Sequence, residues 1–103
     1  MSTERTRELT ALVTAARDGD PQAQDALVGA YLPLVYNVVG RALNGSVDVD
    51  DVVQETMLRA LDALDGLRTP ESFRSWLVAI AMNQVRAHWH TRQNAPGGVE
   101  EAR

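Results

Sequence analysis

Apolar residues recur at intervals of three and four along most of the chain, which is the spacing of one helix face. Asp20-Pro21 and Thr69-Pro70 each place a capping side chain before a proline at the first helical position, and Gly19 and Gly66 follow two helices. Strand patterns are nearly absent. The pattern predicts helices over about residues 3–17, 21–43, 49–64 and 70–92. We therefore expect an all-α fold, a compact bundle of three main helices plus a shorter N-terminal helix.

Local features refine the second and third predicted helices. Pro33 lies inside the second helix and removes one backbone hydrogen bond, so we expect a bend there. Asp48 is expected to cap the third helix, with Asp51 near the positive end of its dipole. The predicted buried stripe of the second helix consists of Ala23, Leu27, Tyr31, Leu34 and Val38.

The third predicted helix has two contrasting faces. Its core side holds apolar residues within about 60° of one another on a helical wheel, namely Val53, Met57, Ala60 and Leu64. The opposite stripe consists of Asp51, Gln54, Glu55, Leu58 and Asp62. A solvated acidic face fits this stripe. A docking face for a basic partner, with Leu58 as its apolar anchor, fits it as well.

The fourth predicted helix is apolar on two sides, which is typical of a helix packed between neighbours. One side holds Phe73, Trp76, Leu77, Ile80 and Gln84, and the other holds Val78, Met82, Val85 and Trp89. A polar line runs between them through Ala79, Asn83, Arg86 and His90. This line suits contact with a groove or a single strand of nucleic acid, or it is a solvated edge. Trp89 is expected either in the core or stacked on a base.

Composition limits the classes of protein that fit. The chain has 103 residues and no cysteine, which indicates one domain without disulfides or thiolate chemistry. Residues 1–65 carry eleven acids against five arginines, whereas residues 66–103 carry three acids against five arginines. The net charge of −4 argues against a free-standing, non-specific DNA-binding protein.

No arrangement of residues predicts catalysis, a metal site or a cofactor. His88 and His90 would point about 160° apart on a helix, so they cannot bind one ion together. No serine has a spaced histidine and acid, and no glycine-rich phosphate loop is present. No apolar run approaches the length of about 20 residues that crosses a membrane, and no secretion signal is evident. We expect a non-enzymatic protein of the cytoplasm, away from membranes.

Three sequence motifs stand in order along the chain. They are LVGAYLPLVY at residues 27–36, DDVVQETMLRA at residues 50–60 and FRSWLVAIAMN at residues 73–83. Together they resemble the second conserved region of bacterial extracytoplasmic-function sigma factors. There, a tyrosine-rich helix is followed by the patterns E-D-L-V-Q-E-x-F-L-R-x and F-x-x-W-L-x-x-I-A-x-N. The resemblance covers about residues 20–93.

The resemblance implies a role in transcription initiation without enzymatic activity. Family members dock on the clamp helices of the largest subunit of core RNA polymerase, which assigns this role to Asp51, Gln54, Glu55 and Leu58. They also recognise and help melt the minus-ten promoter element on the non-template strand, which implies DNA contacts by Asn83, Arg86, His90 and Arg92. The loop of residues 65–69, with Arg68 and Thr69, matches a family loop that helps form a pocket for a flipped-out base. Anti-sigma factors commonly cover this domain.

The resemblance also suggests a domain organisation. Residues 1–93 would form the sigma region 2 helical domain and residues 94–103 a flexible linker or tail, and the family's second DNA-binding domain is absent from this sequence. The chain departs from the family where a cluster of arginines is common, because Ala87, Trp89, His90 and Thr91 stand there and leave Arg92. Two alternatives are a helical protein-interaction module without a DNA role and, less well supported by the five-residue loop, a fragment of a helix-turn-helix repressor.

Overall fold

The computed structural model describes residues 2–94, and the side chains of residues 3–91. Its elements in chain order are α1 (Ser2–Arg17), α2 (Pro21–Ala42), α3 (Val49–Ala63), the short 3₁₀ helices η1 (Leu64–Gly66) and η2 (Pro70–Ser72), and α4 (Phe73–Asn94). The described residues contain no strand, so the predicted all-α fold is confirmed. With 16 residues, α1 is about as long as α3, which has 15. Of the expected tail, residues 95–103 lie outside the described residues.

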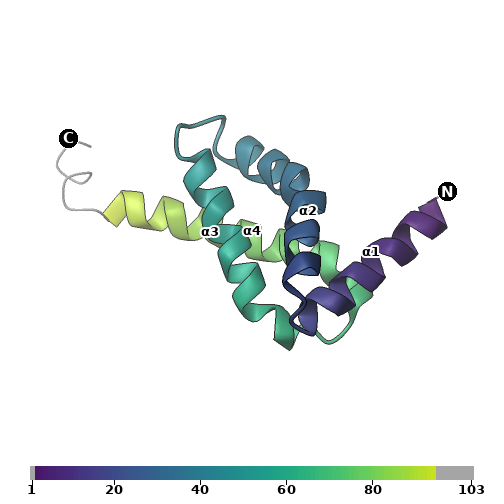
Figure 1. Cartoon of the computed structure of the whole chain (residues 1–103). Helices are drawn as coiled ribbons and strands as arrows, with labels where there is room; N and C mark the ends of the chain where they lie inside the picture. The colour runs from purple at the N-terminus through teal and green to yellow at the C-terminus, as the bar shows by residue number, and fades with distance from the viewer. Residues whose placement is uncertain (1, 95–103) are drawn as a thin grey trace.

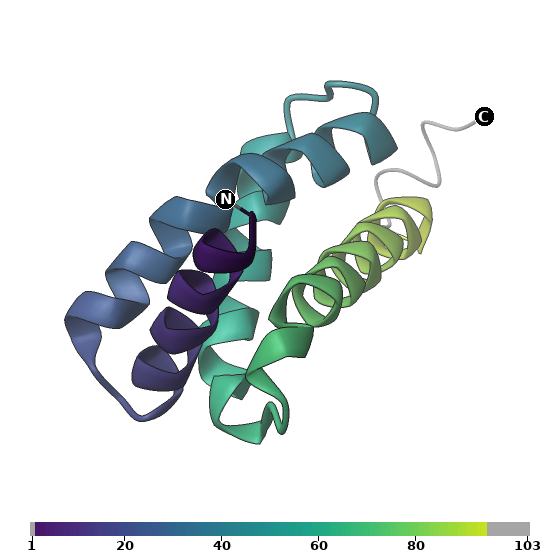
Figure 2. The same ribbon diagram turned by 90° about the vertical axis from the view of Figure 1, so that its right-hand side faces the viewer.

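The helices form one bundle in which α4 contacts both α2 and α3 (Figure 1). Helix α1 packs against α2 and lies alongside the first half of that helix (Figure 2). The start of α1 and the end of α4 lie at opposite ends of the molecule (Figure 1). The two helices that carry most of the predicted site residues, α3 and α4, therefore pack directly against each other.

A single hydrophobic core lies where α2, α3 and α4 meet, and α1 closes one end of it. The four residues predicted for the core side of α3 are all buried. Val52 and Thr56 of α3 are buried as well, and the helical wheel missed them. The other buried residues are Val13, Ala16, Ala23, Leu27, Tyr31, Val35, Val39, Leu43, Leu67, Phe73, Leu77, Ala81 and Val85.

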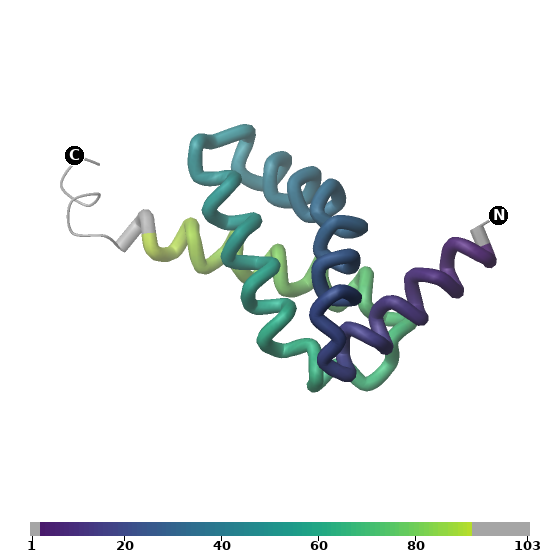
Figure 3. Tube along the Cα trace, viewed as in Figure 1, coloured from purple at the N-terminus to yellow at the C-terminus, as the bar shows by residue number. Residues whose placement is uncertain are grey.

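Helix α2 begins and bends as its sequence predicts. The Asp20 carboxylate accepts hydrogen bonds from the backbone N–H groups of Gln22 (3.0 Å) and Ala23 (3.4 Å), which otherwise would have no partner in the first turn. The axis of α2 changes direction near its middle, where Pro33 lies (Figure 3). The bend follows from the hydrogen bond that proline cannot donate.

The buried line of α2 differs from the prediction beyond this bend. Val35 and Val39 are buried, whereas Leu34 and Val38 are only half-buried. The line thus continues in steps of four residues, each of which turns it by about 40° around the helix. Because α2 contains Pro33 and bends, its second half presents different residues to the core than a straight helical wheel predicts.

Two expected side-chain caps are absent. Asp48 precedes α3 but has helical backbone angles (φ −85°, ψ −2°), and its side chain makes no capping hydrogen bond. A capping side chain normally extends from a residue with extended backbone angles, which explains the difference. Thr69 also makes no side-chain cap, because the proline after it begins the turn η2 and α4 starts only at Phe73.

Helix α4 buries one line of residues that crosses from one of its predicted apolar stripes to the other. This line runs in steps of four through Phe73, Leu77, Ala81 and Val85, and the prediction missed Ala81. The flanking residues Trp76, Ile80, Val78 and Met82 are half-buried, as expected for a helix with a neighbour on each side. Trp89 is 45% exposed, which excludes the core position that was one of its two expected places.

Substitution of Leu77 tests the central role of this line. Leu77 has no exposed surface, so Leu77→Ala leaves a cavity and should lower the free energy of unfolding by about 2–5 kcal/mol. That loss is a large part of the roughly 5–15 kcal/mol typical of a domain. Urea unfolding followed by circular dichroism measures it. The matched control is Leu58→Ala, at a site 56% exposed, which should change stability by less than about 0.5 kcal/mol.

Candidate functional site

The acidic stripe predicted for α3 forms one continuous surface. All five members are exposed and project away from the core, and we call them the acidic face: Asp51, Gln54, Glu55, Leu58 and Asp62. Leu58 is one of the few large apolar side chains exposed among the described residues. An exposed apolar side chain among carboxylates suits a partner that is both basic and apolar.

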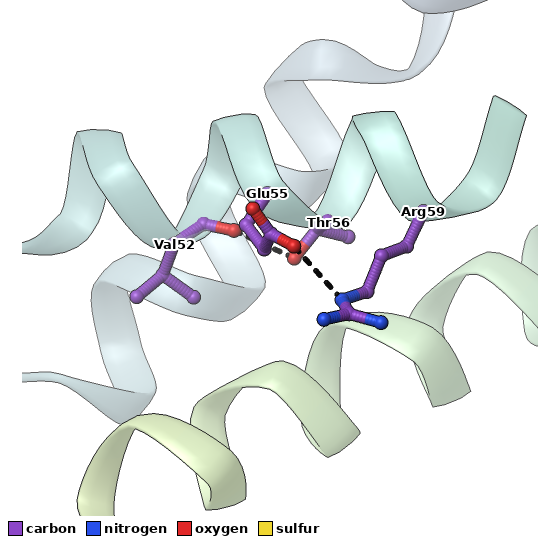
Figure 4. Close-up of polar contacts among 4 residues, drawn as sticks. All are labelled: Val52, Glu55, Thr56 and Arg59. Atoms are coloured by element: carbon purple, nitrogen blue, oxygen red, sulfur yellow. Dashed lines mark hydrogen bonds and ion pairs between the residues drawn. The ribbon is translucent and has the colours of Figure 1, made fainter. Parts of the chain in front are cut away.

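Arg59 of α3 lies beside the acidic face and was missed by the sequence analysis. Its Nε atom lies 2.9 Å from a carboxylate oxygen of Glu55, one helical turn earlier, and both side chains are about half exposed (Figure 4). Such an exposed pair stabilises a helix by only about 0.3–0.5 kcal/mol, so a partner can displace it at small cost. On the core side of the same turn, the Thr56 hydroxyl donates a 2.7 Å hydrogen bond to the Val52 carbonyl (Figure 4).

An exposed tyrosine of α2 borders the acidic face. The Tyr36 hydroxyl donates a hydrogen bond of 2.8 Å to Oδ1 of Asp50, at the start of α3. This hydrogen bond raises the pKa of the Tyr36 phenol above its ordinary value, and the negative charge of Asp50 acts in the same direction. A shallow hollow beside the pair is lined by apolar residues of both helices and by Gln54. The surface of the acidic face thus continues onto α2.

The polar line predicted for α4 is also exposed. We call it the polar seam, and it consists of Ala79, Asn83, Arg86 and His90. The Arg86 guanidinium donates a hydrogen bond to the Asn83 side-chain oxygen, so these two polar groups hold each other in place. Arg92 belongs to α4, but its side chain lies outside those that the structure describes.

The acidic face and the polar seam border one groove between α3 and α4. At one end the groove is lined by Arg59 and Asp62 of α3 and by Asn83 of α4. The adjoining end shares Arg59 and Gln84 and adds Asp51 and Glu55. The structure therefore brings Asp62 of α3 into the same hollow as Asn83 of the seam, which the separate helical wheels did not indicate.

His88 of α4 contacts the segment that precedes α3. Its Nε2 atom lies 3.4 Å from Oδ2 of Asp48, in the connection between α2 and α3, and its ring lies edge-on to Trp89. A helical wheel compares residues of one helix only, so it does not reveal Asp48 as the partner of His88. His88 is half-buried and His90 is exposed, as expected for histidines on opposite sides of a helix.

The loop between η1 and η2 carries the two remaining predicted site residues. Arg68 and Thr69 are exposed, while Leu67 is buried. Nη1 of Arg17, at the end of α1, lies 3.0 Å from the Leu67 carbonyl oxygen and 3.3 Å from that of Arg68. No local pattern in the chain indicates this contact, because the donor lies about 50 residues before its acceptors.

The described part of the chain contains no group of three or more His, Cys, Asp or Glu side chains that could hold a metal ion. Each helix within residues 2–94 is too short or too polar to cross a membrane. The structure thus presents two exposed side-chain surfaces, on α3 and on α4, and an exposed loop before α4.

Comparisons with known proteins agree on one family. The family model for sigma-70 region 2 matches residues 27–95. The chain is 40% identical over 75 residues to the ECF RNA polymerase sigma-E factor of Escherichia coli K12, which covers 73% of this chain and 39% of that protein. It is 32% identical over 85 residues to the RNA polymerase sigma-H factor of Pseudomonas aeruginosa, which covers 82% of this chain and 44% of that protein. The chain thus spans about two fifths of the length of these relatives.

One solved structure is similar over most of the chain. It is the complex of an engineered region 2 of sigmaE with GTAAAA, determined by NMR. The TM-score is 0.75 and the sequence identity is 33%, and the similarity covers 84% of this chain and 92% of that one. The likeness therefore extends over nearly the whole of that domain.

Removing the Asp50 carboxylate tests the contact with Tyr36. Asp50→Asn replaces the carboxylate that accepts the hydrogen bond of the Tyr36 phenol with a weaker, neutral acceptor and removes its negative charge, so the pKa of Tyr36 should fall toward its ordinary value. Alkaline titration of phenolate absorbance measures the change, and Tyr36→Phe identifies which transition belongs to this residue. Asp51→Asn, one residue further along α3, serves as the control. An unchanged Tyr36 titration in Asp50→Asn would show that the hydrogen bond does not persist in solution.

Proposed function

Because the chain belongs to the sigma-70 region 2 family, we propose that it docks on core RNA polymerase and recognises and helps melt the minus-ten promoter element. Members of this family are transcription initiation factors without enzymatic activity, in agreement with the expectation from the sequence. The observation that carries the proposal is the similarity to a sigmaE region 2 solved in complex with GTAAAA. The similarity extends over 92% of that chain, and this coverage supports the proposal of a similar DNA-binding role here.

The acidic face is the proposed docking surface for polymerase. Asp51, Gln54 and Glu55 supply exposed polar contacts, and Leu58 supplies an apolar anchor. Complementary charge accelerates association and fixes the orientation of the partners, while a desolvated apolar side chain contributes most to slow dissociation. We infer that the partner surface is the pair of clamp helices on the largest subunit, with basic side chains opposite these carboxylates.

The polar seam is the proposed reader of the non-template strand. An asparagine amide both donates and accepts, so Asn83 suits the edge of an unpaired base, and Arg86 suits a base or a phosphate. His90 and Arg92 extend the same helix toward its end. In the loop of residues 65–69, the exposed Arg68 and Thr69 are proposed to line the pocket of a flipped-out base.

The charge of the chain supports a division of labour between these surfaces. With a net charge of −4, the isolated domain should bind DNA weakly. Polymerase would then supply the affinity by holding the seam at a high local concentration beside the promoter. An anti-sigma factor that covers the acidic face or the seam would block initiation. We expect the chain to act in the cytoplasm, where transcription takes place.

Loss of two carboxylates tests the docking proposal. In the double variant Asp51→Ala/Glu55→Ala, two exposed charge contacts of about 0.5–1 kcal/mol each are lost, so affinity for sigma-free core RNA polymerase should fall about tenfold. Fluorescence anisotropy of the labelled chain measures it. Glu4→Ala/Glu8→Ala is the control, because it removes the same charge from the exposed start of α1.

The control variant and the unaltered chain separate the possible outcomes. Equal weakening in both double variants would point to net charge rather than to a surface. No binding by the unaltered chain, with its helical fold confirmed by circular dichroism, would favour a helical interaction module with a different partner.

Substitutions in the polar seam test the DNA proposal. Asn83→Ala removes a base-edge contact of about 1–3 kcal/mol, so single-stranded promoter DNA should bind about tenfold or more weakly, with loss of sequence preference.

The salt dependence of binding tests the phosphate contacts. About three phosphates contacted by the seam and loop would give a slope of log K against log salt of about −2 for the unaltered chain. Arg86→Ala should reduce that slope by about 0.7. Arg7→Ala, at an exposed site on α1, should change neither quantity, and tight binding of duplex DNA by the isolated chain would contradict the proposal.

A further inference from the structure

Arg17 is the residue of α1 that reaches the loop between the two 3₁₀ helices. Its Nη1 group donates to two successive backbone carbonyls, that of Leu67 at 3.0 Å and that of Arg68 at 3.3 Å. Helix α1 also contacts η1 and η2 on either side of this loop. The loop therefore rests against the end of α1, far from it in the sequence.

The rest of the loop is held locally. The Leu67 amide donates to the Leu64 carbonyl at 3.0 Å, and the Ser72 amide donates to the Thr69 carbonyl at 2.9 Å, so a closed turn lies on each side. The Leu67 side chain is buried, whereas the side chains of Arg68 and Thr69 are exposed. Arg17 thus fixes the backbone at the point where the loop changes from a buried anchor to exposed side chains.

The positive charge of Arg17 lies beside the loop and is not neutralised by an acidic side chain of the described residues. No ion pair to its guanidinium occurs among the side chains of residues 3–91, and its hydrogen bonds end on uncharged carbonyl oxygens. A guanidinium satisfied in this way keeps its full positive potential beside Arg68. Phosphates that approach the loop would be attracted by both arginines.

We propose that Arg17 is a positioning residue for DNA capture: it holds the backbone of residues 67–68 so that Arg68 and Thr69 form a preorganised pocket for a flipped-out base. This inference rests on the proposed function, because it assumes that the loop binds single-stranded promoter DNA. A loop already ordered by Arg17 loses little conformational freedom when the base enters, whereas a released loop must be ordered by the ligand itself.

The decisive experiment compares variants of Arg17 on a panel of single-stranded hexamers. The panel is based on GTAAAA and carries, at each position in turn, every base or an abasic site. Dissociation constants come from NMR titration at low salt, which detects weak binding. The variants are Arg17→Met, which removes the donors and the charge, and Arg17→Lys, which keeps the charge but not the two-carbonyl geometry. Arg7→Met is the control, with the same loss of charge on an exposed part of α1.

The expected result is a position-specific loss. Two hydrogen bonds from a charged donor order the loop, so Arg17→Met should bind the preferred hexamer about tenfold more weakly. The penalty for an abasic site should shrink at the one position whose base enters the loop and stay unchanged at the others. Arg17→Lys should give an intermediate loss with the same positional pattern, and it also provides the test if Arg17→Met does not fold. Arg7→Met should change binding by less than about twofold.

Three outcomes would overturn the inference. Equal weakening at every position, matched by Arg7→Met, would show that Arg17 acts only through its charge. An unaltered abasic profile in both Arg17 variants would show that the loop needs no positioning by α1, while the proposed function would stand. If the unaltered chain binds no hexamer of the panel, the proposed function itself fails, and this inference fails with it.

Discussion

The packing of α4 between α2 and α3 is the constraint on which the other features depend. Four residues in steps of four, Phe73, Leu77, Ala81 and Val85, bury one line of this helix. The small side chain of Ala81, with no exposed surface, lets the neighbouring helices approach closely at the centre of the line. Because this line is fixed in the core, the polar seam must face outward, and α3 must turn its acidic face outward beside it.

Periodicity predicted what belongs to a single helix, and it failed where separate elements meet. The two faces of α3 and the exposure of the seam follow from a spacing that needs no knowledge of neighbours. The buried line of α2 departed from the wheel only beyond Pro33, where the helix bends. Asp48 failed as a cap because its backbone is helical and its carboxylate lies near His88, and neither fact is visible in a local motif.

The contacts that complete the candidate site are the least visible in sequence. Arg17 meets the carbonyls of the loop across about 50 residues, and Tyr36 meets Asp50 across 14. Both are polar contacts between exposed or half-buried groups, which leave no periodic pattern in the chain. The sequence therefore identified the exposed side chains of the candidate site, but not the contacts that hold the surrounding segments in position.

The shared groove between α3 and α4 connects the two proposed activities physically. A polyanion that approaches Asn83 comes near Asp62, whose charge opposes it, and Arg59 in the same hollow offsets part of that repulsion. Since core residues of both helices fix their separation, the acidic face and the seam keep one relative orientation. A polymerase bound to the acidic face would thus aim the seam at a defined place on the promoter, and specificity would come from position as much as from individual contacts.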